Sequence, residues 1–255
     1  MAGARVIVTG GSSGIGRALA RAMADEGATV VITGRDRERL HEAARNHQSI
    51  RTVVCDVTDA EQIEALHDQV LASGGVDILV NCAGVMHFFD VTSGFPLQRQ
   101  LQEIDIDVAG PVRLVHAFLP HLLQRRSVIV NVSSGLAWVP YASAPVYSGA
   151  KAFVHAWTVA LREQLKGTSV RVVELLPPVT DTPLADGLNP SFARMPTDDL
   201  VQAFLQGLRR GQDEIAPGQS VQLKWLSRLA PGLIFARLNA TSRPSAVHAS
   251  KEHYE

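Results

Sequence analysis

Near its amino terminus the chain reads Val6-Ile7-Val8-Thr9-Gly10-Gly11-Ser12-Ser13-Gly14-Ile15-Gly16. A β-branched apolar run is followed by a Gly-x3-Gly-x-Gly turn and then by apolar residues at helical spacing. Glycines let a backbone turn tightly and approach a ligand, and the amides and dipole at a helix N-terminus attract phosphates. The stretch predicts a dinucleotide pyrophosphate site, although its glycine spacing differs from the commoner fingerprint, Gly-x-Gly-x2-Gly. On this stretch alone, a purely steric role for the glycines stays open. The expected contacts are Gly10, Ser12, Ser13, Gly14, Ile15 and Gly16.

The alternation of strand and helix continues along the chain. The predicted strands are near-continuously apolar, as in a parallel sheet buried on both faces, and lie at Val6–Thr9, Thr29–Thr33, Thr52–Cys55, Ile78–Cys82, Val128–Val132 and Val170–Leu175. Crossover helices are predicted at Ile15–Glu26, Ala60–Ala72, Leu97–Leu123 and Val146–Leu165. This order predicts a doubly wound, three-layer α/β domain. We place it at residues 1–240, with the cofactor half at about 1–130, the catalytic and substrate part at about 131–240, and a flexible tail at 241–255.

Length and composition are those of a globular chain. The 255 residues are 46% hydrophobic and 19% charged, which excludes disorder, collagen-like sequence and coiled coils. The formal net charge of -1 leaves no positive surplus for a nucleic-acid backbone. Two cysteines, Cys55 and Cys82, and no basic-then-apolar leader favour a cytoplasmic protein without a disulfide framework. No apolar run reaches the roughly 18 residues that span a bilayer, and no metal site is expected.

Five motifs resemble those of a known family. Tyr147-Ser148-Gly149-Ala150-Lys151 lies on a predicted helix, and Ser134 lies thirteen residues before the tyrosine. With the glycine-rich turn, Asn81–Gly84, Asn131–Ser134 and Pro177–Thr182, they follow the order and spacing of the short-chain dehydrogenase/reductase superfamily. Within it the chain resembles the DltE-like oxidoreductases, through Val130–Lys151, Asp213–Ile215, Leu226–Gly232 and Leu238-Asn239. The resemblance implies a single Rossmann-type domain with a mainly parallel sheet of about seven strands.

The tyrosine and lysine of the fourth motif can act together. Tyr147 and Lys151 are four residues apart on a predicted helix, so they share a face and the ammonium can lie beside the phenol. An unperturbed tyrosine has a pKa of about 10, and a nearby positive charge favours the phenolate. Tyr147 can then exchange a proton as acid or base. The resemblance implies that Lys151 also binds the nicotinamide ribose and that Ser134 holds the substrate oxygen.

The resemblance implies further cofactor contacts at the ends of three predicted strands. They are Asp56 and Val57, then Asn81, Ala83 and Gly84, and finally Pro177, Val179 and Thr182. The first two groups would support the adenine half, and the third would face the nicotinamide carboxamide. An acid or amide in such a place could equally cap a loop or a helix.

The end of the second predicted strand bears on the choice between NADP and NAD. NAD-selective relatives place an acid there that hydrogen-bonds both ribose hydroxyls. In this chain the position is Gly34, followed by Arg35, whose guanidinium can grip a 2′-phosphate with two hydrogen bonds. We expect NADP to be preferred, with NAD as the alternative cofactor. Asp36 next door weakens the electrostatic argument, and a solvated loop charge is the other interpretation of Arg35.

Two positions depart from the family pattern. Where the family usually has the asparagine of its proton relay, this chain has Asp107 in Asp107-Val108-Ala109-Gly110. We expect the Lys151 ammonium to keep that carboxylate ionised against the opposing effect of burial. The Pro-Gly after the sixth strand is Pro177-Pro178, which stiffens the loop but leaves the Val179 amide intact.

The predicted substrate pocket is mostly apolar. Three loops near the strand carboxyl ends should wall it, at Val85–Phe89, Gly135–Ala144 and Pro183–Pro196. The apolar candidates are Phe88, Phe89, Trp138, Val139, Tyr141, Leu184 and Leu188, and Arg194 is the one candidate for an anionic substrate group. These features predict an NADPH-dependent carbonyl reductase or alcohol dehydrogenase for a hydrophobic ketone, aldehyde or alcohol. The alternative is a catalytically weak or inactive cofactor-binding regulator or scaffold. The presence of Ser134, Tyr147 and Lys151 argues against this alternative, whereas Asp107 in place of the usual asparagine leaves it open.

The apolar segment 221–238 has three candidate roles. In order of preference they are core or subunit interface, substrate lid, and an interfacial membrane helix, the last weakened by Pro231-Gly232. The family resemblance favours a homodimer or homotetramer.

Overall fold

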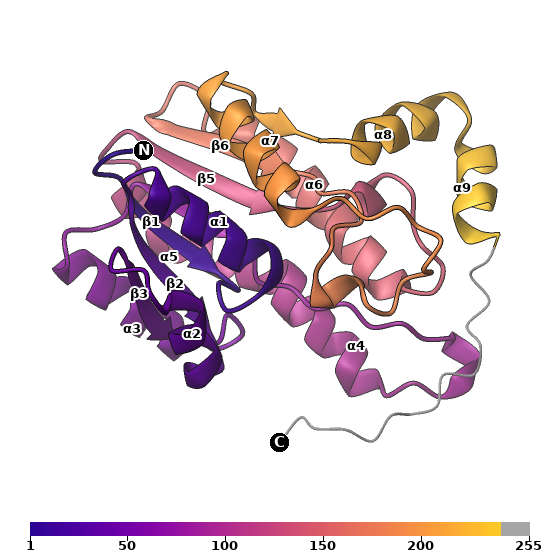
Figure 1. Ribbon diagram of the computed structural model, residues 1–255, viewed down its shortest axis with the longest axis horizontal. Coiled ribbons are helices and arrows are strands. Elements are labelled where there is room, and N and C mark those ends of the chain that lie inside the picture. The colour runs from indigo at the N-terminus through magenta and orange to yellow at the C-terminus, as the bar shows by residue number, and fades with distance from the viewer. Residues whose placement is uncertain (241–255) are drawn as a thin grey trace.

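Seven parallel strands form one sheet in the computed structural model, which describes residues 1–240 (Figure 1). Their order is β3-β2-β1-β4-β5-β6-β7. The strands are β1 (Arg5–Thr9), β2 (Thr29–Gly34), β3 (Ile50–Val54), β4 (Ile78–Asn81), β5 (Ser127–Val132), β6 (Val170–Leu175) and β7 (Glu214–Ile215). Strand β1 pairs with β2 on one side and with β4 on the other, so the connections after β3 continue the sheet in the opposite direction from β1. Folds of this type have a crevice at the carboxyl ends of the strands where this change of direction occurs.

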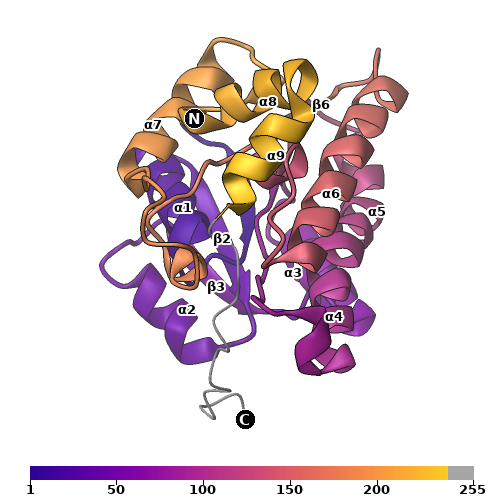
Figure 2. The same cartoon turned by 90° about the vertical axis from the view of Figure 1, so that its right-hand side faces the viewer.

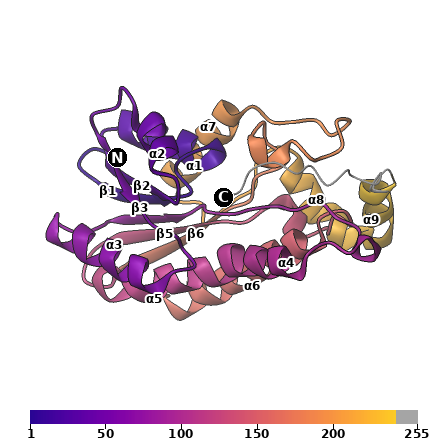
Figure 3. The same cartoon turned by 90° about the horizontal axis from the view of Figure 1, so that it is seen from below.

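Helices cover both faces of the sheet, which makes three layers (Figures 2 and 3). One face carries α1 (Gly14–Asp25), α2 (Arg37–Ala44) and α7 (Thr197–Arg209). The other carries α3 (Ala60–Ala72), α4 (Leu97–Ile104), α5 (Gly110–Leu122) and α6 (Pro145–Gln164). Beyond β7 the chain continues in α8 (Gln219–Leu229) and α9 (Pro231–Asn239). The predicted doubly wound, Rossmann-type α/β fold is confirmed.

The strands are mostly apolar because each face of the sheet builds its own core. One core packs Leu19 and Met23 of α1 and Phe204 of α7 against the sheet. The other packs Leu114 and Phe118 of α5 against the opposite face. With both faces buried, the hydrophobic effect acts on every strand position instead of on alternate ones.

The structure corrects several predicted boundaries and adds elements. The six predicted strands are present with ends shifted by at most two residues, and β7 was too short to give a pattern of its own. The predicted helix Leu97–Leu123 is three pieces, because a π-helical turn at Asp105–Ala109 separates α4 from α5. Pro111 fits at the start of α5, where a missing N–H is tolerated. Helices α2 and α7 were not predicted.

The segment 221–238 is not part of the core, which corrects the core half of its first predicted role, and a subunit interface there stays a prediction. Trp225 is 57% exposed, Leu229 78% and Leu233 64%. The physical reason is position, since α8 and α9 lie past the β7 edge, at the far right of Figure 1. Within residues 1–240, no helix is both long and apolar enough to span a membrane. The predicted flexible tail 241–255 lies outside the described residues.

Candidate active site

The glycine-rich turn between β1 and α1 is packed too tightly for side chains. Gly10 has φ +66°, and a Cβ there would lie 2.8 Å from the Cα of Ala83. A Cβ at Gly16 would lie 2.3 Å from the carbonyl oxygen of Gly10. Thr9 fixes the neighbouring strand end, since its hydroxyl accepts the amides of Cys82 and Ala83 at 3.0 and 3.1 Å. The turn therefore presents backbone at the N-terminus of α1, in the crevice between β1 and β4.

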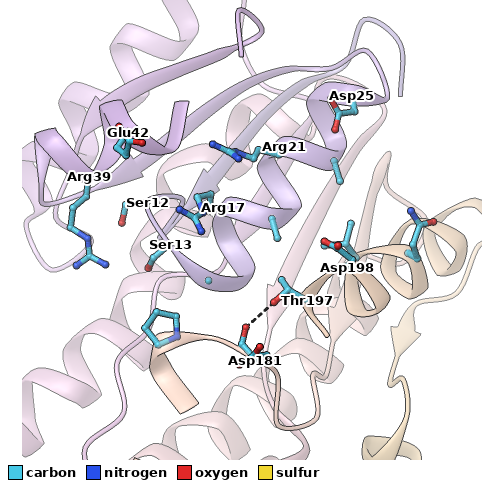
Figure 4. Close-up of a pocket in the computed structure, with 16 residues that line it drawn as sticks. Ser12, Ser13, Arg17, Arg21, Asp25, Arg39, Glu42, Asp181, Thr197 and Asp198 are labelled. Atoms are coloured by element: carbon cyan, nitrogen blue, oxygen red, sulfur yellow. Dashed lines mark hydrogen bonds between the residues drawn. The ribbon is translucent and has the colours of Figure 1, made fainter. Parts of the chain in front are cut away.

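An open cavity of about 720 Å³ lies beside this turn (Figure 4). Ser12, Ser13 and Gly14 line it, and Arg17 and Arg39 lie on either side of the two serines. The cavity also holds four acids, Asp25, Glu42, Asp181 and Asp198. Backbone at a helix N-terminus beside the two arginines suits the phosphates of a dinucleotide. Ser134, Tyr147 and Lys151 are not among the lining residues, so the cavity adjoins the phosphate end of the candidate site and not its chemical end.

The end of β2 leaves room beside the same turn. A Cβ at Gly34 would lie 3.6 Å from the Ser12 hydroxyl, so a longer side chain here would project toward the cofactor turn. Arg35 follows with an exposed side chain. Position 34 itself therefore carries no acid, while Asp36, two residues later, accepts the Arg39 amide at 3.0 Å at the start of α2.

The polar residues at the ends of β3 and β4 have partners within the protein. Asp56 Oδ1 accepts both the amide and the hydroxyl of Thr58, at 2.9 and 2.8 Å, which is the loop-capping arrangement. Val57 is buried against α5. Asn81 is buried and donates to Asn131 at 2.8 Å, which ties β4 to β5. These bonds show how the loops are held, while cofactor contact at Asp56, Val57 and Asn81 stays a prediction.

Ser134, Tyr147 and Lys151 meet beyond the carboxyl end of β5. Ser134 lies two residues past the end of that strand and accepts the Leu136 amide at 3.1 Å, which starts a 3-10 turn at Gly135–Ala137. Tyr147 and Lys151 project from α6, and the Lys151 Nζ lies 5.4 Å from the centroid of the tyrosine ring. Ser134 hydrogen-bonds to the Tyr147 side chain. The three predicted residues are therefore adjacent in space.

Burial works against an ionised tyrosine at this site. It is the largest influence on Tyr147 and raises the pKa of its phenol above the ordinary value. The Lys151 charge and the hydrogen bond with Ser134 lower that pKa, and the Asp107 charge raises it. The effect of Lys151 thus has the expected direction, but it does not outweigh burial.

Asp107 forms a buried ion pair with Lys151. The Lys151 Nζ lies 3.1 Å from Asp107 Oδ2 and donates to the Val132 carbonyl at 3.3 Å, while the Val85 amide donates to Asp107 Oδ1 at 2.8 Å. Burial would lower the pKa of Lys151, but the charges of Asp107 and Tyr147 outweigh it and raise that pKa.

Burial raises the pKa of Asp107 itself in spite of the attraction to Lys151. Its ionised form is therefore less favoured than the sequence suggested, because the carboxylate is fully buried. Gly84 makes the close approach feasible, since a Cβ there would lie 2.9 Å from Asp107 Oδ2 and 3.3 Å from the Lys151 Nζ.

The loop after β6 closes the site on the side of the glycine-rich turn. A Cβ at Gly14 would lie 3.4 Å from the Thr182 side chain, so Thr182 borders the start of α1. The Pro177 carbonyl accepts the Gly135 amide at 3.0 Å, which ties this loop to the one after Ser134. The predicted nicotinamide loop and the predicted phosphate turn are thus neighbours.

The three predicted pocket walls converge on Tyr147. A small apolar cluster around its ring includes residues from each wall and one from α9: Met86, Phe88, Tyr141, Leu184, Leu188 and Leu238. Phe89 is buried and stacks on Phe95, with centroids 4.5 Å apart, and does not belong to the cluster. Arg194 is paired with Asp181 and Asp186 at 3.5 and 3.4 Å, which reduces its availability for an anionic substrate group.

A buried polar network behind Ser134 was missed from the sequence. Glu174 of β6 is fully buried, accepts the Ser133 hydroxyl at 2.5 Å and lies 2.9 Å from the His155 Nδ1. This hydrogen bond raises the pKa of His155. The indole of Trp138 donates to His155 at 3.4 Å, so Trp138 packs with this network instead of with the apolar cluster. The available signal was a single carboxylate in a strand whose other residues are apolar except for Arg171.

Comparisons with known proteins agree with this geometry. The family model described as short chain dehydrogenase matches residues 4–192. The uncharacterized oxidoreductase DltE of Bacillus subtilis is 38% identical over 241 residues, covering 92% of this chain and 96% of that protein.

Solved structures give the same result. A short chain dehydrogenase from Burkholderia cenocepacia in complex with NADP has a TM-score of 0.82 at 26% identity, over 93% of this chain and 98% of that one. A short-chain dehydrogenase from Sphingobium yanoikuyae in complex with NADPH has a TM-score of 0.79 at 25% identity, over 98% and 100% of the two chains.

Proposed function

The chain belongs to the short-chain dehydrogenase family, and from this we propose that it is an NADPH-dependent oxidoreductase that interconverts a hydrophobic ketone or aldehyde with its alcohol. The observation that carries the proposal is the adjacency of Ser134, Tyr147 and Lys151 beside a backbone cradle for phosphates. The two relatives crystallised with NADP and NADPH support the cofactor class. In solution we expect a homodimer or homotetramer, with residues 1–240 as its domain.

Each part of the site has a distinct role in this proposal. Gly10, Ser12, Ser13, Gly14, Ile15 and Gly16 would hold the pyrophosphate, and Thr182 with the Val179 amide would orient the nicotinamide ring. A bound nicotinamide nucleotide would supply or accept the hydride. Ser134 would hold the substrate oxygen, and Tyr147 would donate the proton to that oxygen during reduction and remove it during oxidation. The apolar cluster around Tyr147 would exclude water and favour an uncharged, hydrophobic substrate.

The direct test is oxidation of NADPH with a panel of hydrophobic ketones and aldehydes, followed by identification of the alcohol formed. Turnover that depends on Tyr147 supports the proposal. Tight NADPH binding without turnover of any carbonyl would instead favour the cofactor-binding regulator.

Arg35→Ala should weaken NADPH binding by roughly 1.5–3 kcal/mol, the range for a lost hydrogen bond to a charged group. NADH binding should hardly change, because NADH lacks the 2′-phosphate. The reason is the exposed guanidinium directly after Gly34, a position that itself carries no acid. Fluorescence titration of both cofactors measures the two dissociation constants.

A matched control is Arg45→Ala, which removes an exposed arginine just beyond the far end of α2. It should leave both dissociation constants unchanged. Equal losses of NADPH and NADH binding in Arg35→Ala would mean that Arg35 does not contact the 2′-phosphate.

Asp107→Asn should move the alkaline limb of the pH profile for alcohol oxidation to lower pH, by up to about one unit. The sign follows from charge: the Asp107 carboxylate raises the pKa of Tyr147, so a neutral amide favours the phenolate that accepts the alcohol proton. The measurement is turnover against pH with saturating cofactor for both proteins. Coincident profiles would show that Asp107 is neutral over this range or has no influence on Tyr147.

A further inference from the structure

One side of α6 carries a third polar side chain beyond the candidate active site. Tyr147, Lys151 and His155 follow one another at intervals of four residues, so they lie along the same side of the helix. The first two belong to the site described above. His155 lies one helical turn further on, faces Glu174 of β6, and has no part in the proposed reaction.

Glu174 depends on partners within the protein because its side chain is fully buried. The Ser133 hydroxyl donates to its Oε1 at 2.5 Å, and the His155 Nδ1 lies 2.9 Å from its Oε2. A carboxylate removed from water is destabilising unless such donors replace the water. Since Ser133 directly precedes Ser134, Glu174 holds the start of the turn that carries the candidate catalytic serine.

The other ring nitrogen of His155 meets the end of the same turn. The 3-10 turn Gly135–Ala137 ends at Trp138, whose indole Nε1 donates to the His155 Nε2 at 3.4 Å. The two rings meet edge to face, with centroids 5.7 Å apart. One imidazole therefore holds the turn at both ends, through Glu174 at Ser133 and directly at Trp138.

These contacts specify where the hydrogen of a neutral His155 lies. An indole N–H can only donate, so the His155 Nε2 must be the acceptor of the Trp138 bond. The hydrogen is then on Nδ1, where the Glu174 carboxylate accepts it. A protonated imidazole donates from both nitrogens, so it keeps the bond to Glu174 and loses the bond from Trp138.

The charged groups that face His155 come from three elements. The hydrogen bond with Glu174 of β6 is the largest influence and raises the pKa of His155 above its ordinary value. The Glu214 charge on β7 also raises this pKa, while burial and the Lys224 charge on α8 lower it. Lys224 forms an ion pair with Glu214, and its Nζ lies 5.8 Å from the centroid of the Trp138 ring.

We propose that His155 is a positioning residue for Ser134, which holds both ends of the serine turn when neutral and releases the Trp138 end when protonated. The proposal rests on the proposed function, in which Ser134 holds the substrate oxygen. The ion pair with Glu174 is present below the pKa of His155 and lost above it. The Trp138 hydrogen bond has the opposite dependence, so the KM for a carbonyl substrate should rise as the pH falls through this pKa.

The first test uses no substrate. Nitrogen NMR of protein labelled at histidine, with His155→Gln to assign the signal, reports the midpoint and the tautomer of His155. The neutral form should carry its hydrogen on Nδ1. Glu174→Gln should lower the midpoint by roughly one pH unit. Glu163→Gln removes an exposed carboxylate of the same helix and should leave the midpoint in place.

Two further variants test the sign of the electrostatics without removing a buried group. Lys224→Met should raise the His155 midpoint, because the Lys224 charge lowers it. Glu214→Gln should lower the midpoint, because the Glu214 charge raises it. A general loosening of the structure would not move the two midpoints in opposite directions. This pair also decides the matter if Glu174→Gln does not fold.

The second test measures KM for a carbonyl against pH. His155→Ala should raise KM roughly three- to tenfold, the range for one lost hydrogen bond, with a smaller effect on kcat. His155→Gln should restore KM and abolish its rise at low pH, because an amide can donate to Glu174 and accept from Trp138 without titrating.

Trp138→Phe keeps an aromatic ring and removes the indole donor. Its KM should differ from that of the wild type mainly above the His155 midpoint, where the Trp138 hydrogen bond is present. Trp225→Phe changes an exposed tryptophan of α8 and should keep the pH dependence of the wild type.

Three results would overturn the proposal. One is a neutral His155 that carries its hydrogen on Nε2. Another is a midpoint that moves no more in Glu174→Gln than in Glu163→Gln. The third is a His155→Gln variant whose KM still rises at the pH seen in the wild type. If no carbonyl is turned over, the proposed function fails, while the NMR signal of the Trp138 indole N–H still decides whether protonation of His155 releases the turn.

Discussion

Tyr147→Phe should lower kcat by at least about a hundredfold, the lower end of the range for general acid–base catalysis. The variant keeps the buried ring and its contacts with the apolar cluster, and it removes the hydroxyl that hydrogen-bonds to Ser134. No other titratable hydroxyl is adjacent to Ser134 and Lys151 among the described residues that surround them. Steady-state reduction of a hydrophobic carbonyl with saturating NADPH measures the effect.

Cofactor binding is the internal control for this variant. The dissociation constant of NADPH should barely change, because the phosphates would contact the glycine-rich turn and not the phenol. A variant with near-normal kcat would remove Tyr147 from the mechanism, and with it the proposed oxidoreductase chemistry. A variant that has lost NADPH binding as well would point to a structural role for the hydroxyl.

Gly16→Ala should reduce the free energy of unfolding by about 3 kcal/mol or more, at the upper end of what overpacking costs. Its Cβ would lie 2.3 Å from the carbonyl oxygen of Gly10 and 2.9 Å from the carbonyl carbon, and neither backbone atom can rotate away. For a chain of this size the melting temperature should fall by roughly 6–12 °C. Displacement of the turn should also weaken NADPH binding more than tenfold. Thermal unfolding and cofactor titration measure both effects.

Gly149→Ala is the matched control. Gly149 lies inside α6, is exposed and has nothing within 4 Å of the position that a Cβ would occupy. The same added methyl group should here stabilise the protein by up to about 1 kcal/mol, because alanine has the higher helix propensity. Gly16→Ala with wild-type stability would show that the turn can relax and that its glycines are not required for packing.

Local patterns of residue type were enough to predict the fold. The apolar runs give six of the seven strands, and Ala60–Ala72 and Val170–Leu175 have the predicted ends. These signals are reliable because a parallel strand buried on both faces is mostly apolar, and a crossover helix must present an apolar stripe. The β7 strand has two residues and, within residues 1–240, pairs only with β6, so no period can develop in it.

For the candidate site, the sequence predicted the residues that belong to short motifs. Ser134, Tyr147, Lys151 and the glycine-rich turn are close together because parallel strands end at one edge of the sheet, which makes their spacing along the chain informative. The sequence also indicated that Asp107 would oppose Lys151. It did not indicate how strongly burial acts on either group.

The tertiary structure alone decided the electrostatics and the partners. Glu103 and Glu174 are acids that a sequence would assign to the surface, yet both are fully buried, because the segment 85–87 covers one and the Ser133–His155 network covers the other. The exposed apolar side chains of α8 and α9 are also explained by tertiary position. Their sequence pattern is that of a packed helix, but both helices lie past the edge strand β7, where the sheet does not cover them. A residue's period along the chain specifies the side of its element on which it lies. The solvation of that side, and therefore a buried group's pKa, depends on what the rest of the chain places against it.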